Sequence, residues 1–366
     1  MSQKTQLEPV VRFAAAGDLL LPSMPDGTSP RDFLDALAPI RELLTGCDIV
    51  LGNLECTLPG DGAIVPTEPR VISTVEAIRA IASAGFNIVS LANNHTFDCL
   101  ESGFHNLRRV LDEMGVAHFG AGDDLAQAAA PAILDVKGVR AAFLGAADPQ
   151  SGPFQQASAN QPGVAPFDPP RMIEQIRALA GQVDHVIVSL HWGRERFTIP
   201  SPAQIEQARA LIDAGASVVL GHHPHVVQGM ELHRGRPIAY SLGNFVASEV
   251  PFSDGDRVTW GRRGRTGCVL MVDLARGRVG GIRQAATYDD GRCIHLDESA
   301  SGRSLIAKTN RALERGVTPR RFRRHALWVE AVKPALSCLR WSKLKTLRLR
   351  KLKKAFAAAG KTRKSC

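Results

Sequence analysis

Long apolar runs are missing from this chain of 366 residues. None approaches the roughly 18 consecutive apolar residues that a membrane-spanning helix needs. The N-terminal stretch MSQKTQLEPVVRFAAAGD has no basic segment followed by an apolar one, which is the pattern of a secretory signal peptide. The seven cysteines are scattered without a C-x-x-C pair, which argues against a disulfide framework and a thiolate zinc site. We therefore expect a cytoplasmic protein.

Two common catalytic motifs are also absent. The chain contains no G-x-S-x-G, the nucleophile motif of many serine hydrolases. Gly360-Lys361-Thr362 has the form of the end of a phosphate-binding loop, but Ala355 stands where that loop requires its first glycine. We therefore expect neither a serine hydrolase of this type nor an ATP site.

Charge is distributed unevenly along the chain. Residues 301–366 contain 20 Lys and Arg and only two acidic residues, Glu314 and Glu330. The first 300 residues hold the other 25 basic residues and 34 acidic ones. We therefore predict an acidic body over residues 1–300 and a basic, helical appendage over residues 301–366. Such a basic segment, interleaved with Trp328, Trp341 and leucines, can bind polyanions or lie peripherally on an anionic membrane, or pack as a solvated helix on the acidic body.

The body alternates β-branched runs with amphipathic stretches. We predict strands over 10–17, 47–52, 87–92, 139–145, 184–190, 217–221, 237–243 and 267–274, and helices over 30–45, 73–84, 101–114, 169–181 and 202–214. This alternation favours an α/β fold with buried strands. Segments 59–70 and 147–169, rich in Pro, Gly and small polar residues, are predicted loops.

Polar side chains with metal-ligand chemistry follow six of these strands. The residues at or just after the strand ends are Asp18; Asn53 and Glu55; Asn94, His95 and Asp98; His191; His222, His223 and His225; and Asn244. Ligand sites in α/β sheets lie beyond the carboxyl ends of the strands. Carboxylate, amide and imidazole groups without a thiolate suit Mn, Fe, Zn or Mg, with two ions sharing a carboxylate as one arrangement.

Each of these motifs has an ordinary structural alternative. Asp18 and the GNLE stretch suit turns and helix caps, and His191 alone suits a hydrogen-bonded core histidine. The three histidines of GHHPH favour a metal on their own. Six such coincidences at six strand ends are the weaker explanation, so we predict a site for divalent metal, with two ions expected.

Six segments together are similar to one known family. They are AAAGDLLL, DIVLGNLECTL, GFNIVSLANNHTFD, VIVSLHWGRE, LIDAGASVVLGHHPHVVQGME and IAYSLGNF. In order and spacing they resemble the bacterial CapA family, named for capsule and poly-γ-glutamate biosynthesis proteins, within the calcineurin-like metallophosphoesterase superfamily. The resemblance covers roughly residues 10–250 and implies a four-layer α/β/β/α sandwich with a metal centre between two sheets.

The resemblance also implies roles for individual residues. The metal ligands it implies are Asp18, Glu55, Asn94, His191, His223 and His225, with Glu55 where the superfamily has a bridging Asp. His95 resembles the general acid, with Asp98 orienting it. The sequence departs from the pattern two residues after Asp18, where Leu20 replaces a His ligand. One ligand of the first metal is then either missing or supplied by Asn53. His222, Arg194 and Asn244 are candidate substrate contacts.

Three functions remain open at this stage. The first is a metal-dependent hydrolase of phosphoesters, linked to capsule or exopolymer biosynthesis. The second is a non-hydrolytic accessory factor of exopolymer assembly, stabilised by metal and binding an acidic polymer such as polyglutamate or other synthesis proteins. The third is a phosphodiesterase guided to nucleic acid by the basic tail.

Overall fold

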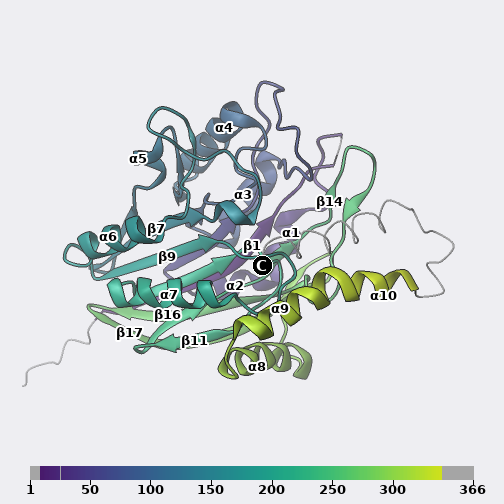
Figure 1. The fold of residues 1–366 in the computed structure, drawn as a ribbon. Helices are drawn as coiled ribbons and strands as arrows, with labels where there is room; N and C mark the ends of the chain where they lie inside the picture. The colour runs from purple at the N-terminus through teal and green to yellow at the C-terminus, as the bar shows by residue number, and fades with distance from the viewer. Residues whose placement is uncertain (1–8, 25, 340–366) are drawn as a thin grey trace, which may run out of the picture.

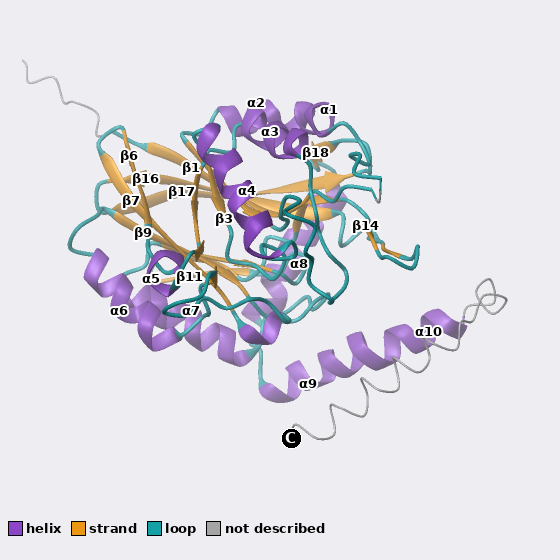
Figure 2. Ribbon diagram, turned by 90° about the horizontal axis from the view of Figure 1, so that it is seen from above, coloured by secondary structure: helices purple, strands orange, loops and turns teal. Residues whose placement is uncertain are grey.

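The protein is built as four layers, with two β-sheets packed face to face and helices on both outer faces (Figures 1 and 2). The structure, a computed structural model, describes residues 9–24 and 26–339. The expected α/β/β/α sandwich is confirmed. The site described below lies at one edge of the two sheets, so the strands that end there matter most.

The first sheet contains eight strands among the described residues. Its path runs β18-β17-β16-β1-β2-β3-β4, and β13 pairs with the end of β1. The strands are β1 (Val11–Leu20), β2 (Ile49–Leu54), β3 (Ile88–Ser90), β4 (Ala117–Phe119), β13 (Asn244–Ala247), β16 (Thr266–Ala275), β17 (Arg278–Asp289) and β18 (Ile294–Leu296). The pairs β1·β2, β2·β3, β3·β4 and β1·β13 are parallel, so their carboxyl ends share one edge.

The second sheet has six described strands in the order β11-β12-β10-β9-β7-β6. They are β6 (Ala132–Val136), β7 (Val139–Ala147), β9 (His185–His191), β10 (Val218–His222), β11 (Met230–His233) and β12 (Arg236–Ala239). Strands β7, β9, β10 and β12 run parallel to one another. Two short pairs complete the described strands: β5 (Ala121–Gly122) with β8 (Gly163–Val164), and β14 (Val250–Pro251) with β15 (Arg257–Val258).

Helices cover the outer faces of both sheets (Figure 2). On the first sheet lie α1 (Phe33–Leu37), α2 (Arg41–Thr45), α3 (Val75–Ala84) and α4 (Leu100–Glu113). On the second lie α6 (Pro169–Leu179) and α7 (Pro202–Ala214). The short α5 (Leu125–Ala128) sits beside the β5·β8 pair. The C-terminal helices are α8 (Ala300–Glu314), α9 (Pro319–Leu327) and α10 (Lys333–Leu339), with a π-helical turn at Trp328–Val332.

The alternation of side chains along β1 explains its central place. Phe13 and Ala15 face the second sheet and pack in the layer between the sheets, whereas Ala14 and Ala16 face the helices. A strand buried on both faces gives a near-continuous apolar run, as VVRFAAAG does apart from the exposed Arg12. Phe13 meets Phe143 of β7 across the interface, with ring centroids 6.1 Å apart.

Small residues allow the strands to converge where the polar side chains begin. A Cβ on Gly17 would lie 1.9 Å from the carbonyl oxygen of Gly243, so only glycine permits β1 to approach the segment before β13. Gly221 is similarly confined, with a Cβ placed 1.9 Å from the carbonyl oxygen of Tyr240. Each glycine directly precedes a site residue, Asp18 or His222.

The predicted strands and helices are largely present in the structure, but two predicted elements differ and several observed strands, β6, β11 and β17 among them, were not predicted. The single helix expected over 30–45 is divided into α1, a 3-10 turn at Ala38–Ile40 and α2, because Pro39 cannot donate a helical hydrogen bond. The strand expected over 237–243 ends at Ala239, and Asn244 begins β13 instead of following a strand.

The first C-terminal helix is part of the folded body. Ile306 and Leu313 of α8 are buried against the sheets, and the Asn310 side chain accepts a hydrogen bond from the Met230 backbone at 2.9 Å. Asn310 also donates to Gln284 of β17 at 2.8 Å. Residues 340–366, which carry much of the predicted basic tail, lie outside the described part. No described helix has the length and apolarity needed to cross a bilayer.

Candidate metal centre

Three neighbouring strands of the first sheet place polar side chains next to one another. Asp18 of β1 is in register with Asn53 of β2 on one side and with Asn244 of β13 on the other. Asn53 Nδ2 donates to Asp18 Oδ1 at 2.9 Å. All three residues are fully buried. Parallel pairing therefore gathers at one sheet edge the groups that lie far apart in the sequence.

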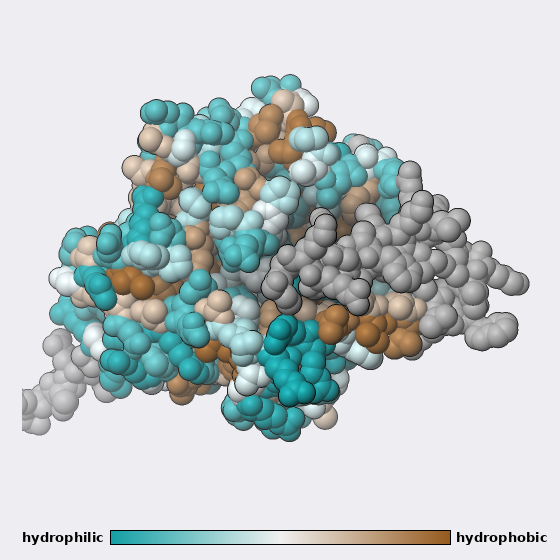
Figure 3. Space-filling view, in the orientation of Figure 1, coloured by the Kyte–Doolittle hydropathy of each residue, from teal (hydrophilic) through white to brown (hydrophobic). Residues whose placement is uncertain are grey.

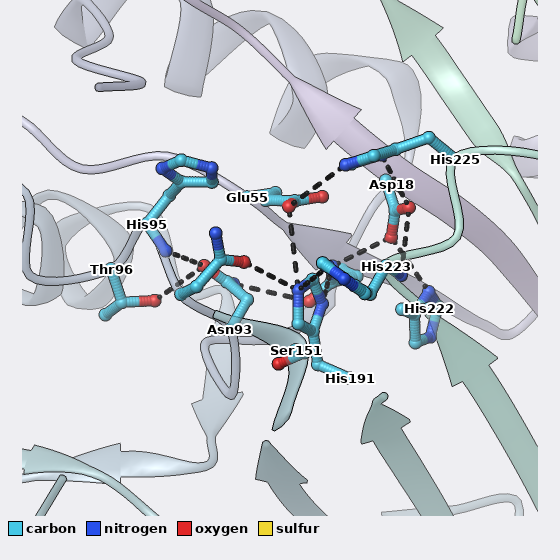
Figure 4. Close-up of polar contacts among 12 residues, drawn as sticks. Asp18, Glu55, Asn93, His95, Thr96, Ser151, His191, His222, His223 and His225 are labelled. Carbon is cyan, nitrogen blue, oxygen red and sulfur yellow. Dashed lines mark hydrogen bonds and ion pairs between the residues drawn. The ribbon is translucent and has the colours of Figure 1, made fainter. Parts of the chain in front are cut away.

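The second sheet delivers its histidines to the same place. His191 ends β9 and is in register with His222, which ends β10. The chain then turns through His223, Pro224 and His225, with φ of 91° at His223 and 54° at His225. A non-glycine residue in this region is strained, and such strain concentrates at functional sites. Here it points both imidazoles toward the first sheet (Figure 4).

Two groups of potential metal ligands meet at Glu55. Asp18, Glu55 and His225 form one group, and Glu55, His191 and His223 form the other, with the ligand atoms of each group within 4.8 Å of one another. Glu55 Oε1 lies 3.6 Å from His191 Nε2 and 3.8 Å from His225 Nε2. One carboxylate shared by two groups is the arrangement that a pair of ions needs.

Glu55 itself shows that this place is suited to a cation. Its side chain is fully buried, and neither carboxylate oxygen has a hydrogen-bond partner among the described residues. Burial raises the pKa of Glu55 to about 8, although the charge of His225 opposes this. A buried carboxylate without donors is costly unless a positive charge compensates it. The residues present thus fit one or two divalent ions.

The other members of the two groups are electrostatically coupled. Burial alone would raise the pKa of Asp18, but hydrogen bonds and charge interactions with His222 and His225 hold it well below its usual value. Burial lowers the pKa of His223 to about 4, which favours the neutral imidazole that binds metal. Burial acts in the same direction on His225, but Glu55 and Asp18 raise its pKa to about 10.

Asn94 contacts His191 of the second sheet, and its neighbour Asn93 forms hydrogen bonds that hold the loop after β3. Asn94 Oδ1 lies 2.7 Å from His191 Nε2, and His223 Nδ1 lies 3.1 Å from the same nitrogen. Asn93 donates to the Leu54 carbonyl at 2.9 Å and accepts from the His95 backbone at 3.0 Å. The second residue of the NNH motif therefore reaches the centre, while the first fixes the loop that carries it.

His95 lies beside Glu55 (Figure 4) and forms a buried pair with Asp98. Their contact, between His95 Nδ1 and Asp98 Oδ2, measures 2.8 Å, and the same carboxylate oxygen accepts the Val71 backbone N–H at 2.7 Å. Burial lowers the pKa of His95, but the charges of Asp98 and Glu55 outweigh it, so the net shift is upward. A histidine of this kind can hold a proton near neutral pH.

The three candidate substrate contacts lie in different settings. His222 is buried with Nδ1 3.2 Å from Asp18 Oδ1, and Asn244 Oδ1 lies 2.9 Å from His225 Nδ1. Arg194 is half-exposed, pairs with Glu330 and lies over the Phe197 ring. Only the first two are within the cluster.

The sequence analysis missed two residues at the rim of the candidate metal centre. The Trp260 ring lies 5.0 Å from the His225 ring, and Glu195 is close enough for the charges of His225 and His223 to lower its pKa against the opposing effect of burial. Glu195 stands four residues after His191 in the quoted motif, so its position was visible; Trp260 had no local signal.

Comparison with known proteins agrees with this fold. The crystal structure of a phosphatase from Mycoplasma pneumoniae shares the fold, with a TM-score of 0.50 and 11% identity over 78% of this chain and 95% of that one. The protein thus has the calcineurin-like metallophosphoesterase fold.

The family is narrower than the fold. Residues 12–249 match the family described as bacterial capsule synthesis protein PGA_cap, and the chain belongs to this family. The capsule biosynthesis protein CapA of Bacillus anthracis is 37% identical over 47% of this chain and 42% of its own length. The PGA biosynthesis protein CapA of Bacillus subtilis is 31% identical over 66% of this chain and 65% of its own length. The matches thus span less than two thirds of either relative.

Proposed function

We propose that this protein is a metal-dependent phosphoesterase that acts in capsule or exopolymer biosynthesis, with poly-γ-glutamate as the exopolymer. The observation that carries the chemistry is the meeting of two ligand groups at one unpartnered carboxylate, Glu55. The observation that carries the biological setting is membership of the capsule synthesis family, whose relatives are named for capsule and PGA biosynthesis.

We assign the ligands by proximity. Asp18, Glu55 and His225 would hold one ion, and Glu55, His191 and His223 the other. Asn94 would add a neutral oxygen beside His191. Asn53, the expected substitute ligand, instead directs its amide nitrogen to Asp18, and its oxygen accepts a hydrogen bond from Asn93. A nitrogen and oxygen set without thiolate suits Mn, Fe, Zn or Mg.

Individual side chains of the site can be given roles in the proposed hydrolysis. When bound, the ions would supply Lewis acidity to the phosphoryl oxygens and make water more acidic. His95 would give a proton from Nε2 to the leaving oxygen, because Nδ1 is held by Asp98. Asp98 would fix the ring orientation and stabilise the charged imidazole. Arg194, His222 and Asn244 stay our proposed substrate contacts.

Turnover tests this proposal. The purified protein should hydrolyse p-nitrophenyl phosphate or bis(p-nitrophenyl) phosphate, lose activity with a chelator, and recover it on addition of Mn²⁺. Glu55→Gln should be inactive, whereas Glu76→Gln, the same change at an exposed position of α3, should retain full activity. Absence of turnover in metal-loaded protein would favour the alternative, a metal-stabilised accessory factor that binds acidic polymer or other synthesis proteins.

We further propose that the C-terminal region contacts an anionic membrane surface or polyanion. Leu327, Trp328, Val332 and Leu336 are exposed large apolar residues. Figure 3 shows apolar surface here beside the strongly hydrophilic surface of α9, which carries four arginines (320, 321, 323 and 324). Apolar and cationic groups side by side are typical of segments that lie at an anionic lipid interface.

A further inference from the structure

A cationic cavity adjoins the candidate metal centre. It measures about 310 Å³, and its lining includes Arg196, Arg262, Arg263, Lys333, Trp260 and His225. None of the described residues that line it is acidic. A concave site with four cations and an aromatic wall is shaped for a negatively charged group.

Most of these cations form no ion pair among the described residues, although Glu195 lies near Arg196 and His225. Arg262 lies 3.3 Å from Asp297 Oδ2, but Arg196, Arg263 and Lys333 form no ion pair within the described part of the chain. Like charges gathered in a cavity repel one another, and an anion from outside would relieve that repulsion. The cavity therefore favours an anionic occupant over a neutral one.

The cavity and the metal centre share a wall. His225, a ligand candidate at the centre, also lines the cavity, and the Trp260 ring packs 5.0 Å from it. Trp260 is fixed by a hydrogen bond from Nε1 to the Ser248 carbonyl at 2.8 Å. An acidic group in the cavity would therefore lie next to a phosphoryl group held at the centre.

The C-terminal helices complete the cavity. Lys333 begins α10, and the segment before it is attached to the loop after β9 at several points. Thr198 N–H donates to His325 Nε2 at 3.1 Å, and the rings of Phe197 and Phe322 lie 5.5 Å apart. Residues 259–264 and Lys333 follow position 249, where the family match ends. This cavity is thus made largely by parts of the chain beyond the family match.

We propose that the cavity is an anion subsite that binds a second acidic group of the substrate, a phosphate or a carboxylate, next to its phosphoester. The substrate class is then a molecule with two or more anionic groups, not a simple monoester. Placing the phosphoester at the metal centre rests on the proposed function. The affinity of the cavity for anions does not depend on it.

Calorimetric binding without turnover tests the subsite. The probes are fructose 1,6-bisphosphate for phosphate and tetraglutamate for carboxylate, with inorganic phosphate as the single-anion reference. Arg263→Gln/Lys333→Gln should weaken binding of at least one probe about tenfold, since an exposed cation contributes up to about fivefold. Inorganic phosphate, which carries only one acidic group, should lose less affinity in this variant than the affected probe. Arg41→Gln/Arg79→Gln, on α2 and α3, removes the same charge elsewhere and should change binding less than twofold.

The outcomes separate the two proposals. Selective loss for fructose 1,6-bisphosphate or for tetraglutamate identifies which acidic group the subsite takes, and either supports it. The inference is overturned if the wild type binds neither probe, if the cavity variant binds both as the wild type does, or if the control variant weakens binding equally. Selective probe binding without any phosphoester turnover would refute the proposed hydrolase activity and leave the subsite standing.

Discussion

Asp18 and His222 belong to different sheets, and Asp18 Oδ1 lies 3.2 Å from His222 Nδ1. This contact shows how tightly the edges of β1 and β10 converge at the centre. The layer between the sheets is apolar along most of its length, with Phe13, Phe143 and Leu220 among its members. At the carboxyl ends of β1 and β10 the contacts become polar, with Asp18 from one sheet and His222 from the other. In the proposed site the first sheet would thus supply carboxylates and the second sheet imidazoles.

Metal content should depend on the histidines of the turn after β10. We expect the wild type to bind about two divalent ions and the His223→Ala/His225→Ala variant to lose most of both, because each proposed group then lacks an imidazole. Metal analysis of purified protein measures this. His105→Ala/His233→Ala, which changes two exposed or half-exposed histidines, is the matched control and should keep its metal. Equal metal in all three proteins would refute the ligand assignment.

Asn94 and His95 should differ in their effects on catalysis. His95→Ala should keep its metal but lose about 10²–10⁴-fold in rate on esters with poor leaving groups, because the proton donor is gone. It should lose much less on an activated aryl phosphate. Asn94→Ala should weaken metal binding and slow both substrates alike, since its carbonyl lies beside His191. Loss of metal in His95→Ala would instead make His95 a ligand.

Asp98 offers a way to test the buried pair separately. Asp98→Asn keeps the size of the side chain but removes the charge that raises the pKa of His95. The acidic group's step in the pH–rate profile should therefore move to lower pH, with activity at neutral pH falling mainly for poor leaving groups. A profile that does not move, in protein with unchanged metal content, would contradict the role proposed for Asp98.

A buried histidine far from the centre should make stability fall in mild acid. His185 Nε2 donates to the Ala275 carbonyl at 2.7 Å, and Nδ1 lies 3.0 Å from Ser217 Oγ. Burial lowers the pKa of His185 from 6.5, so the unfolded chain binds the proton first as the pH falls. Stability due to this neutral histidine is thus complete above about pH 6.5 and is lost as the pH falls toward the folded pKa.

Denaturant unfolding of His185→Gln measures that effect. The variant should be about 1–3 kcal/mol less stable than the wild type at pH 8, because buried partners lose a hydrogen bond. The difference should shrink as the pH falls from 7 to 5. His233→Gln, at a more exposed site, should show neither effect. A constant difference across this range would mean that His185 does not titrate as described.

Membrane association should follow the C-terminal helices. Removal of residues 318–366 should abolish binding to anionic vesicles at low salt, whereas removal of 340–366 alone leaves the exposed apolar residues around Trp328 in place. Cosedimentation with anionic and neutral vesicles measures binding, and metal content checks that the body is intact. A cut at position 302 is unsuitable, because it would delete the buried side chains of α8. Equal vesicle binding by the full chain and the 318–366 deletion would refute the idea.

The sequence was most informative about the parallel strands near the centre. Continuous apolar runs predicted β1, β2, β9 and β10, and the residues at their ends predicted the cluster, because parallel strands must end at one edge. Asn244 was harder to place, since it starts β13 and pairs with Asp18 through a long-range register that no local pattern encodes. Trp260 was missed for the same reason. β17 is half-exposed and glycine-containing, so its apolar pattern is weak.

His223 and His225 have a left-handed backbone, which favours glycine, at positions where the proposed metal site needs imidazole side chains. Glycine would adopt these angles without steric cost, so a chain selected only for a stable fold would carry glycine at both. Histidine at these positions lowers folding stability but provides imidazoles for the proposed metal site. Replacement of both by glycine should therefore abolish metal binding and reduce the backbone strain of this turn. At the turn after β10, folding stability and the proposed metal binding would therefore oppose each other.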